Sequence, residues 1–391
     1  MHIAYTAEQS DLLERVRAFL AEIMTPELRA ECADREGGGP LYHQAMQRLG
    51  REGWLGLGWP KEAGGGGRSL VDEFIFFDEM HRQGFPIPLL TLNTVGPTLA
   101  QFGTPEQKAK YLPQILAGKL HFSIGYSEPS AGTDLASLTT RAERVGDEYV
   151  ITGQKIWISL ADHADFLWLA CRTDPTAPKH RGISIIMVPM NAPGVSFTPI
   201  KNLGDANIAA VYLEGVRVPV GNLIGKENGG WRLITSQLNH ERVALMMVGP
   251  LARLSKEVLE WAAQTDASDD KKVLDLAWVR RNLARVEQGL EVLRLMNWRQ
   301  AANLDHGTLL AHEASAIKVY GSEFYVEAHR LLIEVLGAPG ILSRGSSGAL
   351  LRGELERHYR ATLVLTFGGG VNEVQRDIIA TVGLGLPRAE R

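Results

Sequence analysis

The sequence predicts an α+β protein whose helices and strands are segregated along the chain. The first third has helical periodicity, the middle carries short runs of β-branched and aromatic residues, and helical periodicity returns after residue 229. Such segregated runs favour an α+β fold or separate domains over alternating βαβ units. A chain of 391 residues is long enough for several domains of roughly 100–200 residues. We predict domains at residues 1–120, 121–228 and 229–391.

The N-terminal domain is predicted to be helical. Thr6 and Gln9 have the spacing of a capping box, and apolar residues then recur at helical period as far as Ile23. Pro26 is expected to end or bend this first helix. Turn-rich stretches at 37–40 and 64–67 separate further helices, which we expect over residues 41–53, 70–83, 88–102 and 105–117.

The middle domain is predicted to be a compact β domain. Its apolar runs are short and are bounded by Gly, Pro, Asp or Asn, which is typical of strands. We expect strands at Tyr149–Ile151, Ile156–Ile158, Phe166–Cys171, Ile183–Val188 and Ala209–Leu213.

The C-terminal domain is predicted to be helical again. Helical periodicity extends over four longer segments and one short one, near residues 231–263, 273–303, 311–336, 350–366 and 371–382.

Charge and cysteine content narrow the class of protein. Lys plus Arg is 41 and Asp plus Glu is 45, a net charge of −4 that does not suit a nucleic-acid binder. The cysteines, Cys32 and Cys171, are too few for a disulfide framework. The first residues carry acids where a signal peptide would be basic, and no stretch approaches about 18 apolar residues. We expect a cytoplasmic protein without a membrane span.

Several common catalytic motifs are missing. The sequence contains no GxxxxGK[ST], no GxGxxG after a strand, no HExxH and no GxSxG. The histidines and cysteines do not cluster at metal-ligand spacings, so we expect no metal site. The run Gly64–Gly67 lacks the Lys-Ser/Thr of a P-loop, and we interpret it as a flexible turn.

One carboxylate lies in an aliphatic pattern. Ile234, Leu238, Glu241, Leu245 and Val248 recur at steps of four and three, which places them on one face of one helix. A carboxylate there would be desolvated, which raises its pKa and makes it a candidate general base. A purely structural Glu241, paired with an arginine elsewhere or at the edge of an interface, stays open at this point.

Three segments resemble the acyl-CoA dehydrogenase family. FSIGYSEPSAGTD (122–134) is similar to the family's (F/Y)xxTEPxAGSD loop, and VGDEYVITGQKIWIS (145–159) is similar to its hairpin. GGGVNEVQRDIIA (368–380) resembles the family's C-terminal YEGTNEIQR stretch. The resemblance covers essentially the whole chain. It implies an N-terminal helical domain, a middle β-barrel domain and a C-terminal four-helix bundle.

The resemblance also implies that the two middle-domain segments bind FAD. Gly132 would let the backbone approach the cofactor closely, and Thr133 would lie near CoA as well. Trp157, Ile158 and Ser159 match residues that cover the isoalloxazine ring and bond its polar edge. The full set implied for FAD is Ile124, Tyr126, Ser127, Gly132, Thr133, Trp157, Ile158, Ser159 and Glu373.

The catalytic base is implied to lie at Glu241. In many family members the base is in the C-terminal motif, but alignment of that motif places Gly369 there. NHER (239–242) resembles the motif of a second subgroup, which includes the isovaleryl- and long-chain enzymes and carries its base on a helix. The implied substrate contacts are Thr133, Asn239, Arg242 and the Gly369 backbone N–H. Asn239 stands where relatives often have Asp.

The implied reaction is α,β-dehydrogenation of an acyl-CoA thioester. Glu241 would remove an α-proton while the β-hydride passes to FAD, which yields a trans-2-enoyl-CoA. Hydrogen bonds to the thioester carbonyl would matter because charge develops there in the transition state. By the same resemblance, an electron-transfer flavoprotein would reoxidise the flavin.

Two departures from the family pattern predict a hetero-oligomer. The connector AAQTDASDDKKV (262–273) lacks the RxxFG arginine that reaches a neighbour's FAD, and Glu334 replaces the usual glutamine. A charged hydrogen bond of that kind contributes about 1.5–3 kcal/mol. We therefore expect a paralogous acyl-CoA dehydrogenase-like subunit in an α2β2 assembly. A homo-oligomer with a substitute contact is the alternative.

Within the family, FSIGYSEP, LNHERVAL and LTFGGG resemble the glutamate-bearing subunits of actinobacterial steroid side-chain acyl-CoA dehydrogenases. This resemblance implies a bulky sterol or polycyclic acyl-CoA as substrate. Two other functions remain open at this point: a flavin monooxygenase on the same fold, and a non-catalytic structural subunit.

Overall fold

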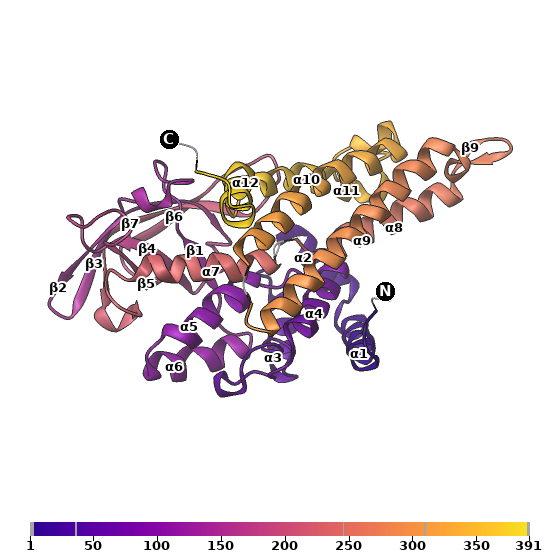
Figure 1. Ribbon diagram of the computed structural model, residues 1–391. Coiled ribbons are helices and arrows are strands. Elements are labelled where there is room, and N and C mark those ends of the chain that lie inside the picture. Colours follow the sequence, from indigo (N-terminus) through magenta and orange to yellow (C-terminus); the bar gives the residue numbers. More distant parts are fainter. Residues whose placement is uncertain (1–3, 36, 245, 309, 389–391) are drawn as a thin grey trace.

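The computed structural model describes residues 4–35, 37–244, 246–308 and 310–388, with the side chains of 34, 35 and 238–244 left undescribed. The sheet lies at one end of the molecule and a bundle of long helices extends from the other (Figure 1). The N-terminal helices lie along one side, and α7 (Gly230–Ala244) lies between sheet and bundle.

The N-terminal domain has six α-helices in its described part: α1 Ala7–Ile23, α2 Pro26–Arg35, α3 Pro40–Arg51, α4 Leu70–Arg82, α5 Gly96–Phe102 and α6 Pro105–Leu116. The predicted capping box of α1 is confirmed. The Gln9 N–H donates to Thr6 Oγ1 at 3.2 Å, and the Thr6 N–H donates to Gln9 Oε1 at 3.0 Å. These two bonds satisfy backbone donors that the first turn leaves free.

Two predictions in this domain are wrong in detail. Pro26 is the first residue of α2, a helix that we did not predict. Proline suits that position because its φ is already helical and its missing N–H would have no partner there. The helix expected at 88–102 is a π-helical turn, Leu90–Val95, followed by α5.

The middle domain forms one mixed sheet, with strands β1 Phe122–Gly125, β2 Arg141–Val145, β3 Glu148–Ser159, β4 Phe166–Arg172, β5 Ile183–Pro189, β6 Val195–Pro199, β7 Ile208–Pro219 and β8 Leu223–Ile224. The described pairings give the order β6-β7-β3-β2-β4-β5-β8, and β1 pairs in parallel with β4. The resemblance implied a barrel, whereas these pairings trace a sheet whose ends are β6 and β8.

Strand lengths differ from the prediction. The two runs expected at 149–151 and 156–158 belong to a single twelve-residue strand, β3. Strands β2 and β6 were not predicted because most of their side chains are exposed and they carry no apolar run.

The C-terminal domain contains α7, α8 Gly249–Gln264, α9 Ala277–Asp305, α10 Ala311–Leu336, α11 Glu354–Thr362 and α12 Asn372–Ile378. Helices α8, α9, α10 and α11 share one hydrophobic core, as expected of a four-helix bundle. A short hairpin, β9 Asp266–Ser268 and β10 Lys271–Lys272, connects α8 to α9. No described helix is both long enough and apolar enough to cross a membrane.

The single helix predicted at 231–263 is wrong. The structure ends α7 at Ala244 and begins α8 at Gly249, with Pro250 in the first turn of α8. A proline there cannot donate the N–H that a continuous helix needs. Val248 precedes α8 and is therefore not on the same helix as Ile234, so the five-residue stripe does not extend to Val248.

Candidate active site

Two segments of the β domain lie together and form what we call the loop platform, residues 122–128 and 155–159. The Ile156 N–H donates to the Ser127 carbonyl at 2.9 Å, and the Ser123 hydroxyl donates to the Ser159 carbonyl at 2.7 Å. The platform thus brings Ile124, Tyr126 and Ser127 together with Trp157, Ile158 and Ser159.

A buried ion pair joins the two segments of the platform. Lys155 Nζ is 2.8 Å from Glu128 Oε1 and donates to the Tyr126 carbonyl at 3.0 Å. Glu128 also accepts the backbone N–H groups of Thr139 and Thr140 at 2.6 and 2.8 Å. Burial would raise the pKa of Glu128, but the Lys155 ammonium and these donors outweigh it and lower that pKa to about 2. The pair is therefore charged, and it ties the first platform segment to the second.

Trp157 presents an apolar surface to solvent at the end of β3. Its side chain is 56% exposed and its φ is +63°, a left-handed conformation that few bulky residues adopt. The neighbouring Ile158 is buried, whereas Ser159 is exposed. An exposed indole beside accessible hydroxyl groups is a surface on which a flat aromatic ligand can stack.

Gly132 and Thr133 lie on an exposed turn after the first platform segment. A Cβ at Gly132 would meet no atom of this chain within 4 Å, so packing within the chain does not require glycine there.

Helix α7 contacts the platform through a residue that the sequence did not indicate. The Tyr126 hydroxyl donates to Gln237 Oε1, and Gln237 is 1% exposed. Gln237 Nε2 has no hydrogen-bond partner among the described residues. Position 241 follows one turn later on the same helix face. That i, i+4 relation to Glu241 is the signal that could have identified Gln237.

Three predicted site residues lie in the undescribed part of α7. Asn239, Glu241 and Arg242 belong to the helix, but their side chains are outside the described residues. Their predicted roles stay predictions.

The C-terminal motif contributes Gly369 and Glu373, both exposed. Gly369 has φ +67°, so a glutamate at this position would be strained, which agrees with the absence of the usual base there. Asn372, the residue before Glu373, accepts from Lys318 Nζ of α10 at 2.9 Å. The described bonds of this motif thus run to the bundle rather than to the loop platform.

Comparison with known proteins agrees with this arrangement. Models of the N-terminal, middle and C-terminal domains of acyl-CoA dehydrogenases match residues 6–119, 123–216 and 228–384. The chain belongs to the acyl-CoA dehydrogenase family. It is an oxidoreductase that acts on a CH–CH bond, and its order of helical, β and helical domains is confirmed; the boundaries at 120 and 228 remain predictions.

Individual relatives are similar over their whole length. The acyl-CoA dehydrogenase FadE26 of Mycobacterium tuberculosis is 52% identical, with 100% of each chain covered. A chain in the crystal structure of the ChsE4-ChsE5 complex from the same organism is also 52% identical and superposes with a TM-score of 0.93 over 100% of each chain. The structure titled Tcur3481-Tcur3483 steroid ACAD is 49% identical with the same TM-score and coverage.

Proposed function

We propose that this chain is the glutamate-bearing subunit of a hetero-oligomeric, FAD-dependent acyl-CoA dehydrogenase that converts a bulky sterol side-chain or polycyclic acyl-CoA to its trans-2-enoyl-CoA. The observation that carries the proposal is the contact between Tyr126 of the loop platform and Gln237 of α7. It places the helix of Glu241 against the segment proposed to bind the flavin.

The residues of the loop platform fit a flavin. Trp157 offers an exposed indole face, and Ser127 and Ser159 offer hydroxyl groups. Gln237 of α7, which contacts the platform, has a side-chain N–H with no hydrogen-bond partner among the described residues. Bound FAD would supply the acceptor for the hydride that leaves the β-carbon of the substrate. The platform's part is to hold the ring flat and exclude water, and Gly132, Thr133 and Glu373 are proposed as further contacts to the cofactor.

Glu241 is proposed as the general base. Its carboxylate takes the α-proton, and the electron pair of the broken C–H bond becomes the second bond between the α- and β-carbons as the hydride departs. The Gly369 N–H, Thr133, Asn239 and Arg242 are proposed to hold the thioester. An electron-transfer flavoprotein is the proposed acceptor that regenerates the enzyme.

Contacts at the far end of the bundle support the proposal of a different partner chain. Glu334, which stands where the family has glutamine, accepts from Asn282 Nδ2 at 3.0 Å and pairs with Arg330. The β9–β10 hairpin lies in the connector that lacks the RxxFG arginine, and in it Lys272 Nζ pairs with Asp266 at 2.6 Å. Arg330 and Lys272 are thus already paired with carboxylates of this chain, which disfavours their binding the phosphate of a cofactor on a second chain.

The proposed substrate class is based on the names of similar solved structures. The second similar structure is titled a steroid enzyme, and both similar structures are named as pairs of different chains. We extend both properties to this chain by their similarity to it.

The decisive test is Glu241→Gln in the assembled enzyme. We expect anaerobic dye reduction with a sterol side-chain CoA thioester to fall by about 10²- to 10⁴-fold, because the variant cannot accept the proton. Glu260→Gln, at an exposed position of α8, is the control and should keep its activity. Unchanged turnover in Glu241→Gln would show that Glu241 is not the base.

Flavin stoichiometry tests the hetero-oligomer. We expect the chain purified alone to be poor in flavin, and the complex with its paralogous partner to hold about half a FAD per chain. A full complement of FAD on the lone chain would show a self-sufficient homo-oligomer instead. Comparison of the sterol thioester with octanoyl-CoA in the same complex tests the substrate class.

A further inference from the structure

The main chain that follows α7 is fixed by side chains from three other helices. We call residues 246–249 the junction. Asn297 Nδ2 of α9 donates to the Met246 carbonyl oxygen at 2.8 Å. The Tyr325 hydroxyl of α10 donates to the Met247 carbonyl oxygen. Asp78 Oδ1 of α4 accepts the N–H groups of the last two residues, each at 2.7 Å. Every residue of the junction is thus anchored by a side chain from outside it.

The three anchors are buried, so each bond is costly to lose. Asp78, Asn297 and Tyr325 are 9%, 0% and 8% exposed. Removing one partner of a buried hydrogen bond typically leaves an unsatisfied group that costs about 1–3 kcal/mol. Asn297 Oδ1 has no partner among the described residues, so the bond that this side chain makes within the chain is the one to the junction. Packing alone would be served better by an apolar residue.

Packing holds the junction from both sides. Met246 belongs to the core of the bundle, whereas its neighbour Met247 belongs to the core shared by the N-terminal helices. A Cβ at Gly249 would lie 2.2 Å from the backbone carbonyl oxygen of Asp78, so α8 starts in direct contact with α4. The junction therefore cannot slide without disturbing two hydrophobic cores.

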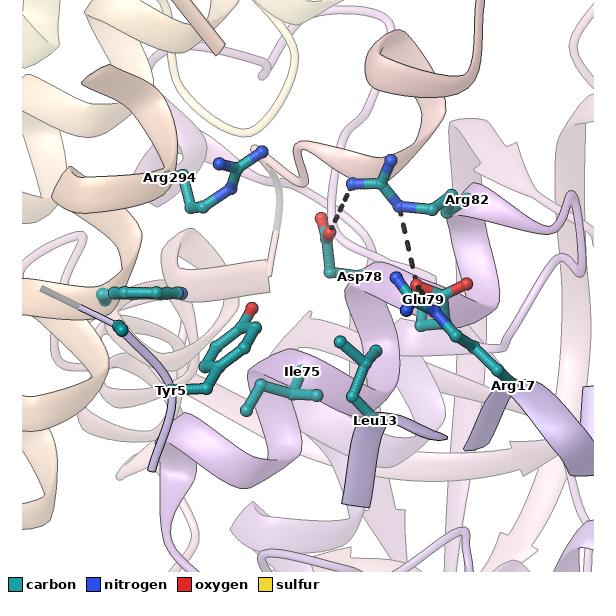
Figure 2. Close-up of a pocket in the computed structure, with 10 residues that line it drawn as sticks. Tyr5, Leu13, Arg17, Ile75, Asp78, Glu79, Arg82 and Arg294 are labelled. Carbon is teal, nitrogen blue, oxygen red and sulfur yellow. Dashed lines mark ion pairs between the residues drawn. The ribbon is translucent and has the colours of Figure 1, made fainter. Parts of the chain in front are cut away.

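Asp78 also faces a cavity beside the junction. The cavity has a volume of about 430 Å³, and Figure 2 shows Asp78 between Arg82 and Tyr5 on its wall. Asp78 Oδ2 is 3.7 Å from Arg82 Nη2, which leaves Oδ1 for the two junction N–H groups. A carboxylate at the start of α8 is further stabilised by the positive end of the helix dipole.

We infer that Asp78, Asn297 and Tyr325 are positioning residues for the catalytic base. An α-helix is stiff along its axis, and Met246 lies two residues past Ala244, the described end of α7, so anchoring the main chain at Met246 would limit where that end of the helix can lie. The anchors act on Glu241 through this helix. The inference rests on the proposed function of Glu241. A displacement of about 1 Å at a reacting group can cost up to 10²-fold in rate.

The test uses Tyr325→Phe in the assembled, flavin-loaded enzyme. This change removes only the hydroxyl that bonds the Met247 carbonyl. We expect the single-turnover rate of flavin reduction, per bound flavin, to fall about 10-fold with KM within about 2-fold, and the isotope effect of an α-deuterated substrate to rise. Tyr320→Phe is the matched control. Tyr320 lies on the same helix as Tyr325, and its hydroxyl donates to the Gly289 carbonyl of α9 at 3.3 Å, away from the junction. The control should stay within about 2-fold.

A second measurement does not depend on activity. Hydrogen exchange by mass spectrometry should show faster exchange in peptides covering 230–249 for Tyr325→Phe and Asn297→Leu, and no change for Tyr320→Phe. Lower thermal stability with unchanged flavin reduction per flavin and unchanged exchange in both variants would overturn the inference. If Glu241→Gln stays active, the proposed base is wrong, whereas the exchange result still decides whether the anchors hold α7.

Discussion

The loop platform and the junction are both anchored by side-chain hydrogen bonds, but the bonded residues lie at very different distances along the sequence. Both hold main chain in place with buried side chains. In the platform, the anchoring bonds join residues 11 to 36 positions apart. In the junction, they join residues 51 to 171 positions apart.

The difference explains why one region is recognisable in the sequence and the other is not. The platform's ion pair, hydroxyl groups and exposed tryptophan lie within two short segments, so they form a motif. The junction's anchors are an asparagine, a tyrosine and an aspartate on three separate helices. In the sequence each of them is an ordinary helix position.

The largest effect that would test this comparison is expected at Lys155. Lys155→Met leaves the Glu128 carboxylate buried without its counter-ion, and we expect the free energy of unfolding to fall by about 3–5 kcal/mol. Chemical denaturation of the complex measures it. The double variant Lys155→Met/Glu128→Gln should recover a large part of the loss. A single change costing less than about 1 kcal/mol would show that the pair does not hold the platform.

The pH dependence of stability should report the same pair. The pKa of Glu128 is lowered from 4.5 to about 2, so its contribution is present above pH 4.5 and is lost as the pH falls towards 2. A shift of this size corresponds to about 3 kcal/mol. Denaturation midpoints between pH 5 and 2 should fall less steeply in the double variant than in the wild type. Equal slopes would contradict a charged pair.

A smaller effect is expected where the junction meets α4. Gly249→Ala places a methyl group 2.2 Å from the Asp78 carbonyl oxygen, so backbone must move, and we expect a loss of about 1–3 kcal/mol. Thermal unfolding measures it. Gly221→Ala is the control, because a Cβ there would meet nothing within 4 Å. If the two variants are equally stable, the junction has more freedom than the contacts indicate.

The smallest effect is expected at Ser123. Ser123→Ala removes the bond to the Ser159 carbonyl, one of several that join the two platform segments, and should cost about 1 kcal/mol. Ser10→Ala, at an exposed position of α1, should change stability by less than about 0.5 kcal/mol. A loss well above 2 kcal/mol in Ser123→Ala would show that this bond, rather than the ion pair, dominates the platform.

The sequence by itself predicted the order of helical and β domains and the capping box of α1, and its resemblance to the family indicated the two segments that form the loop platform. These features depend on local periodicity or on bonds between residues close in the chain, and both leave a pattern in the order of residue types. The same reasoning placed Glu241 on a helix, because the apolar spacing around it is local.

Only the tertiary structure decided where that helix ends and what holds it. The contact of Gln237 with Tyr126 and the anchoring of the junction join segments that are far apart in sequence. The apolar spacing continues through the break between Ala244 and Gly249 and predicted one long helix. In the structure α8 begins at Gly249 with Pro250 in its first turn, and Met246 and Met247 pack into two different cores, which exist only in the folded chain.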